Sequence, residues 1–191
     1  MHSQNSPITK NWLTKLACFV GIAGVTTLIS FPVLAKFFPR YALFQPSAYS
    51  NYPYRTSNNN IASTLSGDSK FANMTEELKQ AGLMETLKQP GHFTIFAPTN
   101  TAFNTLSKDT FKRYSESNNR LRVLKYHMVA GVVTQQDIDR GTIATVEGTP
   151  VRITVDQDTV KLNDAIAKHP SIVTKNGVII EIDKVLLPSG F

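Results

Sequence analysis

The stretch HFTIFAPTNTAF, residues 92–103, decides the fold of this chain. Its first half, Phe93 to Ala97, is a short apolar run of the kind that forms a buried strand. Pro98 then fixes φ and withholds a backbone donor, so we expect the strand to end there. Thr99 or Asn100 follows in a position to cap a helix. Such an abrupt change from strand to helix marks either a corner of the core or an exposed catalytic residue.

The residues around this corner favour the first of these interpretations. Ala102, Phe103 and Leu106 recur at helical spacing and would pack beneath a strand that turns Phe93 and Ile95 toward the core. No Gly-x-Ser-x-Gly segment accompanies the corner, which therefore lacks the nucleophile elbow of a hydrolase. We predict that the stretch is part of the structural core and not a catalytic site.

Length and composition are those of a globular domain with an N-terminal extension. The chain has 191 residues, of which 41% are hydrophobic and 18% charged, and this excludes wholesale disorder. The formal net charge of +6 means that nucleic acid must be considered as a partner. Because the lysines and arginines are spread along the chain without forming a basic run, we predict no nucleic-acid partner.

Residues 1–35 have the pattern of a secretory signal peptide. Two lysines precede an apolar, uncharged run, and Val33 and Ala35 have the small-residue spacing of a signal-peptidase site. We expect cleavage after Ala35, which predicts a secreted, periplasmic or cell-surface protein. The alternative is an uncleaved membrane anchor, because the run 16–35 could just span a bilayer.

A tether is predicted between this signal and the folded domain. Residues 36–60 are rich in Tyr, Pro and Asn and show no sustained period, so we assign them to a flexible linker. Its aromatic and basic character would also suit contact with a membrane surface.

The folded domain is predicted to cover residues 61–191. It contains no cysteine, because Cys18 lies within the signal, so disulfides and cysteine metal sites are excluded.

Two amphipathic helices are predicted in the first half of the domain. The first lies within 68–83, with Gly82 as its stop signal. The second lies within 118–129, with Asn118 or Asn119 as its cap. The side chains expected to face the core share helical spacing: Phe71, Met74 and Leu78 in the first helix, and Leu121, Leu124 and Met128 in the second.

From residue 142 the hydrophobic period changes to two, which indicates short strands. Five such runs are separated by turn residues, and the strongest hairpin signal is Asn176-Gly177, for which we predict a type I′ turn. Val178, Ile180 and Ile182 would share one face of the last strand, beside the strand at 93–97. Helices first and antiparallel strands last predict an α+β fold.

Three motifs in this order resemble the fasciclin-like domain family. They are FTIFAPTNTAFNTL at 93–106, YHMVAG at 126–131 and NGVIIEIDKVLLP at 176–188, and the resemblance covers about 61 to 188. It implies a β-wedge of short, mainly antiparallel strands with the N-terminal helices packed against it. It also implies an exported single-domain protein, as found in bacteria. Such a protein would act without catalysis in adhesion, through a cell-surface or matrix protein or polysaccharide.

The resemblance further assigns roles to single residues. Scaffold roles fall on Phe93, Phe96, Pro98, Thr99, Asn100, Phe103, Asn176, Gly177 and Asp183. Tyr126, His127 and Ile172 would contact a partner, although Tyr126 and His127 could instead brace the end of a helix. The family often has Asp-Ile where this chain has Ser171-Ile172, so adhesion through that acidic residue is not supported. Ile180 likewise stands where the family commonly has histidine.

The sequence contains no clear catalytic or metal-binding constellation. His92, His127 and His169 each stand alone, and no His/Asp/Glu spacing suits a metal, so we predict no metal, no cofactor and no enzyme. Two alternatives to a binding module remain. One is a domain for small apolar ligands or a membrane surface, and the less favoured one is a hydrolase that uses His127.

Overall fold

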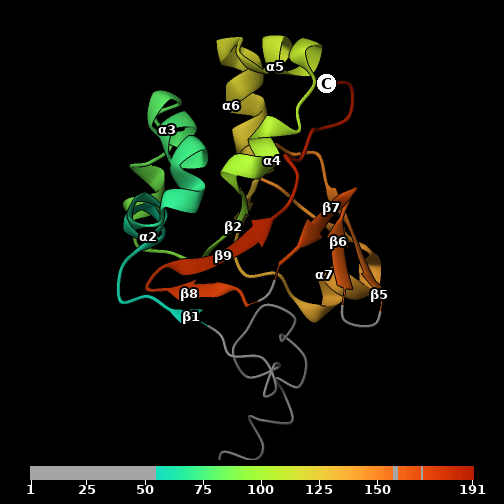
Figure 1. The fold of residues 1–191 in the computed structure, drawn as a ribbon. Helices are drawn as coiled ribbons and strands as arrows, with labels where there is room; N and C mark the ends of the chain where they lie inside the picture. The colour runs from blue at the N-terminus through green and yellow to red at the C-terminus, as the bar shows by residue number, and fades with distance from the viewer. Residues whose placement is uncertain (1–54, 157–158, 169) are drawn as a thin grey trace, which may run out of the picture. The chain divides into compact units, whose positions relative to one another are not determined.

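The computed structural model describes residues 55–156, 159–168 and 170–191 (Figure 1). The predicted signal, its cleavage at Ala35, and the tether as far as residue 54 lie outside the described residues. The elements, in chain order, are β1 (Arg55–Thr56), α2 (Ile61–Gly67), η2 (Ser69–Phe71), α3 (Ala72–Gln80), η3 (Thr86–Lys88), β2 (Phe93–Pro98), α4 (Asn100–Asn104), α5 (Lys108–Tyr114), α6 (Ser117–Tyr126), β3 (Met128–Ala130), α7 (Gln135–Arg140), β4 (Thr142–Ile143), β5 (Val151–Asp156), β6 (Thr159–Leu162), β7 (Ala165–Ala167), β8 (Ile172–Thr174) and β9 (Gly177–Ile182).

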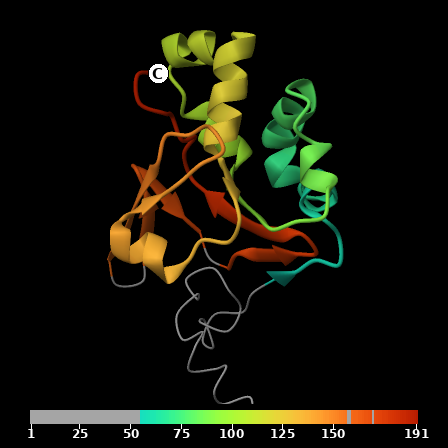
Figure 2. The same cartoon turned by 180° about the vertical axis from the view of Figure 1, so that it is seen from behind.

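The strands join into one mixed sheet, and the predicted α+β class is confirmed. The order β1-β8-β9-β7-β6-β5-β4 forms the main path, and β2 joins it by pairing with β9 and β3. The β1–β8 and β2–β9 pairs are parallel, and the other pairs are antiparallel. Helices α2 to α6 lie over one side of β2, β8 and β9 (Figure 1). Helix α7 packs against β4 and β5 (Figure 2).

Strands β2 and β9 are buried on both faces, which makes them the centre of the domain. Ile95, Ala97 and Ile179 belong to the cluster under the helices, with Phe71, Met74, Leu78 and Phe103. The opposite cluster contains Phe96, Val178, Ile180 and Ile182, with residues of β5, β6 and β7. The predicted shared face of Val178, Ile180 and Ile182 is therefore confirmed, and so is the pairing of this strand with the one at 93–97. Strands buried on both sides explain why these two runs are almost continuously apolar.

The strand-to-helix corner at residues 97–100 consists of a strand end and a helix cap. Strand β2 stops at Pro98, and the hydroxyl of Thr99 accepts a hydrogen bond from the Ala102 amide at 3.3 Å. The side chain of Asn100 accepts from the Asn73 amide at 2.9 Å and donates to the Ser69 carbonyl at 2.8 Å. The corner thus fastens the start of α4 to the start of α3, and both polar side chains are used by the scaffold.

The predicted caps of the second helix are wrong. Helix α6 begins at Ser117, after Glu116, so Asn118 and Asn119 lie inside its first turn. The Asn119 side chain instead donates to the Arg113 carbonyl at 3.0 Å, which joins α6 to the end of α5. Met128 is buried as expected, but it lies in β3, because the chain leaves the helix at His127.

The hairpin between β8 and β9 is confirmed, but its predicted type I′ turn is wrong. Thr174 pairs with Gly177, so the loop residues are Lys175 and Asn176, and neither has positive φ. Gly177 is the first residue of β9 and has φ 153°. The Asn176 side chain turns inward and forms buried hydrogen bonds, so contacts with the rest of the domain determine this turn.

Strand β1 lies within the segment that the sequence assigns to the tether. The Ser57 amide donates to the Val173 carbonyl at 2.8 Å, and the Lys175 amide donates to the Asn59 carbonyl at 3.0 Å. These backbone hydrogen bonds hold residues 55–59 along β8. Because they involve no side chains, the amino-acid pattern of this segment could not have predicted them.

Candidate functional site

The Tyr-His pair lies inside the domain, where α6 passes into β3. Tyr126 is 2% exposed and His127 1% exposed. The His127 Nδ1 lies 2.8 Å from the Val123 carbonyl oxygen, and its Nε2 accepts a hydrogen bond from the Leu186 amide at 3.0 Å. Since Nε2 accepts, Nδ1 carries the proton and donates to Val123. The neutral ring ties the end of α6 to the C-terminal segment.

Burial lowers the pKa of His127 from 6.5 to about 4, although its hydrogen bond to Val123 acts in the opposite direction. A second proton on the ring would remove the acceptor from Leu186 and leave a charge in the core. His127 therefore stays neutral in the folded domain at any pH well above 4.

Acidification is expected to destabilise the domain through His127. Because the folded pKa lies below the unfolded one, the stabilising contribution is complete above pH 6.5 and is lost as the pH falls toward 4. We expect the free energy of unfolding to fall by about 2 kcal/mol between pH 6.5 and 5, measured by urea titration. The His127→Gln variant should be less stable at pH 7 and should lose this slope. A slope that survives in the variant would assign it to other groups.

Tyr126, His127 and Ile172, for which the sequence predicts partner contacts, lie mostly inside the domain. All three side chains are largely buried, with Ile172 only 5% exposed, so only small parts of Tyr126 and Ile172 reach the surface, each at the edge of a hollow, and His127 offers none. Ile172 packs in the cluster under the helices, next to Ser171, which is also buried. The alternative, in which Tyr126 and His127 brace a helix end, agrees with this geometry.

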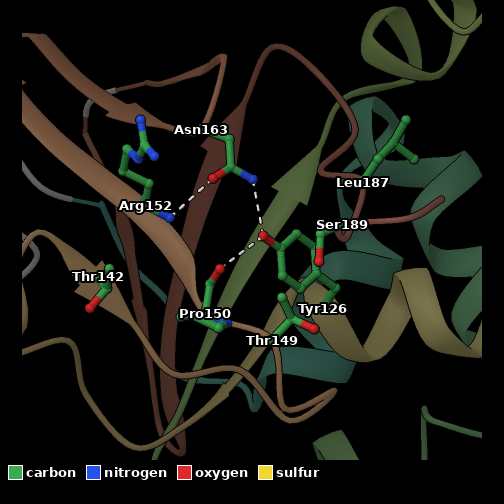
Figure 3. Close-up of a pocket in the computed structure, with 8 residues that line it drawn as sticks. All are labelled: Tyr126, Thr142, Thr149, Pro150, Arg152, Asn163, Leu187 and Ser189. Atoms are coloured by element: carbon green, nitrogen blue, oxygen red, sulfur yellow. Dashed lines mark hydrogen bonds between the residues drawn. The ribbon is translucent and has the colours of Figure 1, made fainter.

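The hydroxyl of Tyr126 nevertheless reaches the floor of a surface hollow of about 520 Å³ (Figure 3). The hollow lies where β4, β5 and β6 meet the end of α6 and the C-terminal segment. The described residues that line it are mostly polar: Tyr126, Thr142, Thr149, Pro150, Arg152, Asn163, Leu187 and Ser189. We call this hollow the Arg152 groove.

A chain of hydrogen bonds fixes the floor of the Arg152 groove (Figure 3). The Tyr126 hydroxyl donates to the Pro150 carbonyl and accepts from the Asn163 side-chain amide, both at 3.1 Å. The Asn163 Oδ1 accepts from the Arg152 amide at 3.0 Å. Asn163 has a φ of 53°, and among the described residues it is the only one besides glycines with a positive φ. Asparagine tolerates this conformation, so the turn between β6 and β7 can aim its side chain into the groove.

A second hollow adjoins the Arg152 groove. It has about 410 Å³ and shares Asn163 and Leu187 with the groove. Its other lining residues lie after α4, in α5, in the turn between β6 and β7, and near the end of β9: Thr105, Leu106, Ser107, Thr110, Asp164, Lys184 and Val185. Lys184 pairs with Asp164 at 3.1 Å, so their charges offset each other. A third, separate hollow of about 480 Å³ lies between β1 and α2 and includes Arg55 and Asp68, which form an ion pair at 3.7 Å.

Arg152 alone carries a charge among the described residues that line the groove. The nearby Glu147 carboxylate is engaged elsewhere: it accepts from the Thr149 amide at 2.8 Å and from the Arg122 Nε at 2.7 Å. Hydrogen bonds from Thr149 and then Arg122 lower the pKa of Glu147 to about 2. Arg122 also donates to the Ser189 carbonyl at 2.9 Å and so holds one rim of the groove.

The sequence did not indicate Arg152, Thr142, Thr149 or Ser189 as site residues. Each comes from a different turn or strand: the register of β5 with β4 brings Arg152 beside Thr142, and the Arg122 hydrogen bond holds Ser189 at the rim. Asn163 was recognised as a turn residue, but its position against Tyr126 depends on the packing of the sheet on α6. No local motif could have revealed this arrangement.

The scaffold residues of the motifs occupy the interior or the polar joints of the domain. Phe96, Pro98, Phe103, Asn176 and Gly177 are buried. The Asp183 carboxylate accepts from the Ile166 amide at 2.7 Å and joins β7 to the end of β9.

Neither a metal centre nor a membrane span is found in the described ranges. No three His, Cys, Asp or Glu side chains gather there closely enough to hold a metal ion. None of the helices between residues 55 and 191 combines the length and apolar character needed to cross a bilayer.

Comparison with known proteins gives the family. The Fasciclin domain matches residues 69–188, which span most of the described structure. This chain belongs to the fasciclin domain family. The fold of the fasciclin domain is also seen in the FAS1 domain pair from the insect cell adhesion molecule fasciclin I. That match has a TM-score of 0.53 at 16% identity and covers 68% of this chain and 51% of the other.

Relatives of this fasciclin domain occur in bacteria and animals. The uncharacterized protein sll1735 of Synechocystis is 37% identical over 130 residues, which are 67% of this chain and 97% of the relative. The immunogenic protein MPB70 of Mycobacterium bovis is 31% identical, over 67% of this chain and 68% of MPB70. Human periostin is 32% identical, but the match covers only 15% of that protein and 65% of this chain.

Proposed function

We propose that this protein is a non-enzymatic binding module that attaches a cell surface or extracellular matrix to a protein or glycan partner. Two observations support this function. The chain is a fasciclin domain, and a solved protein with the same fold is a cell adhesion molecule. The single observation that carries the proposal is that the apolar motif residues of β2 and β9 are packed in the core, whereas the Arg152 groove presents polar side chains to solvent.

The Arg152 groove is the contact surface in this proposal. Its floor is held by hydrogen bonds from Asn163 and Tyr126, and the Arg122 guanidinium fixes its rim at Ser189. A preorganised surface loses little conformational entropy when a partner binds. The groove would therefore bind without rearrangement of the fold.

The test is an attachment assay with a blocked groove. Ser189 is exposed in the groove, so Ser189→Trp would fill it without disturbing the core. Cells that produce this variant should attach to matrix-coated surfaces several-fold less well than wild-type cells, close to a deletion strain. Ser117→Trp, on an exposed serine outside the groove, is the matched control and should attach normally. Attachment by the deletion strain at the wild-type level would refute the proposal.

Export by residues 1–35, with cleavage after Ala35, is part of this proposal. A mature protein outside the cytoplasm would place the groove where a surface partner can reach it. Mass spectrometry of the mature protein should give an N-terminus at Lys36. An intact N-terminus in the membrane fraction would instead support the uncleaved anchor.

The other functions are less well supported by the described geometry. Both ring nitrogens of His127 bond to backbone groups inside the domain, so His127 cannot act as the base of a hydrolase. The three hollows are open to solvent, whereas a small apolar ligand calls for an enclosed apolar cavity.

A further inference from the structure

We propose that the Arg152 groove binds an acidic polysaccharide, with the Arg152 guanidinium pairing with the carboxylate of a uronic acid unit. This inference rests on the proposed function and specifies the chemical class of the partner. The same groove would serve a protein partner if the inference fails, so the two ideas can be separated by experiment.

The electrostatics of the groove favour an anion. Arg152 is exposed at the start of β5, and no hydrogen bond or ion pair joins its guanidinium to another described side chain. The Glu147 carboxylate, in the turn before β5, is held by Arg122 and Thr149. A guanidinium offers paired N–H donors that match the two oxygens of a carboxylate. The groove thus presents one unsatisfied cation to solvent.

The remaining lining suits a sugar. Thr142, Thr149 and Ser189 supply hydroxyl groups to the groove lining, and Asn163 supplies an amide that retains hydrogen-bonding capacity. Its Nδ2 donates one hydrogen to Tyr126, and its second hydrogen has no partner among the described residues. Groups that both donate and accept complement the hydroxyls of a saccharide.

The shape of the surface favours a chain over a single small anion. Asn163 and Leu187 also line the second hollow, so the two adjoining hollows together offer more room than one sugar unit needs. An acidic peptide is less well matched, because peptide recognition usually depends on an apolar pocket for an anchoring side chain. Here Pro150 and Leu187 are the apolar walls, and polar residues form the rest of the described lining.

The inference is tested by calorimetric titration of the full-length protein with short oligogalacturonates and with the same oligomers fully methyl-esterified. The acidic oligomers should bind, with an affinity that falls as salt rises, and the neutral esters should bind at least about tenfold more weakly. Arg152→Gln should weaken binding of the acidic form about tenfold or more, and Arg152→Lys should retain part of it. Because Arg152 is exposed, these variants should unfold at the wild-type urea concentration.

Lys161→Gln is the matched control. Lys161 is an exposed cation on β6, two positions before Asn163 and outside the groove lining. This variant should bind within about twofold of wild type, because it removes equal charge from the same sheet but no contact. Equal losses in the Arg152 and Lys161 variants would overturn the inference in favour of diffuse attraction. Equal binding of acid and ester would overturn it as well.

Absence of saccharide binding would also overturn the inference, as would Arg152-dependent binding of polyglutamate in preference to the uronate oligomers. Neither result would refute the proposed function. That function is measured independently by the Ser189→Trp attachment assay, and a protein partner could still occupy the groove.

Discussion

Replacement of Gly177 by alanine is expected to leave most of the protein unfolded. A Cβ at this position would lie 2.0 Å from the Phe93 carbonyl oxygen and 2.8 Å from the Phe93 nitrogen. These are backbone atoms of the first register pair between β2 and β9, so they cannot move without separating the central strands. The φ of +153° adds strain for any side chain. We expect a cost of about 5 kcal/mol or more, which is comparable with the whole stability of a domain.

Far-UV circular dichroism and urea unfolding measure this effect. Gly67→Ala is the matched control, because Gly67 ends α2 and a Cβ added there would have no neighbouring atom within 4 Å. Alanine there should change the free energy of unfolding by no more than about 1 kcal/mol, since it is the better helix former. A Gly177→Ala protein with the wild-type urea midpoint would contradict the close approach of the two strands.

Asn176→Ala is expected to have the second largest effect. The Asn176 side chain is buried, accepts from the Ile61 amide at 2.8 Å, and donates to the carbonyls of Leu87 and Gln89 at 2.8 and 2.9 Å. It therefore joins the hairpin to the start of α2 and to η3. Alanine would leave these backbone groups without partners in the interior. We expect a loss of about 3–5 kcal/mol, because each unsatisfied buried group costs about 1–3 kcal/mol.

Two further substitutions separate this effect from a simple loss of volume. Asn176→Asp preserves the shape and the acceptor for Ile61, but it turns an oxygen toward two carbonyl oxygens, so it should be at least as destabilising as alanine at pH 7. Asn119→Ala removes an amide whose hydrogen bonds are exposed, and it should cost less than about 1 kcal/mol. Urea titration of the three variants provides the comparison. A loss below about 1 kcal/mol for Asn176→Ala would contradict the role of Asn176.

The centre of the fold could be predicted from the sequence because its signals are local and agree with one another. The apolar run at 93–97, the stop at Pro98 and the cap at Thr99 each have a physical meaning within a few residues. The apolar run at 177–182 is equally clear, and two such strands with no polar face had to be covered on both sides.

The missed elements carry weaker signals. Helices α5 and α7 are short and polar, although α7 has a capping box between Thr134 and Asp137 that could have revealed its start. The type I′ turn at Asn176-Gly177 was predicted because both residues tolerate positive φ, but buried hydrogen bonds to other segments override that preference. The groove was missed for a different reason. Tyr126, Arg152 and Asn163 meet only through sheet register and helix packing, which no local pattern encodes.

The parallel pairing of β2 with β9 also governs how the chain can fold. Phe93 must find Gly177, so the central ladder closes only after nearly all of the domain's residues are available. Pairings between positions so distant in the chain require closure of a long loop, and they slow the acquisition of native structure. A nascent chain that still lacks β9 would therefore remain open during synthesis.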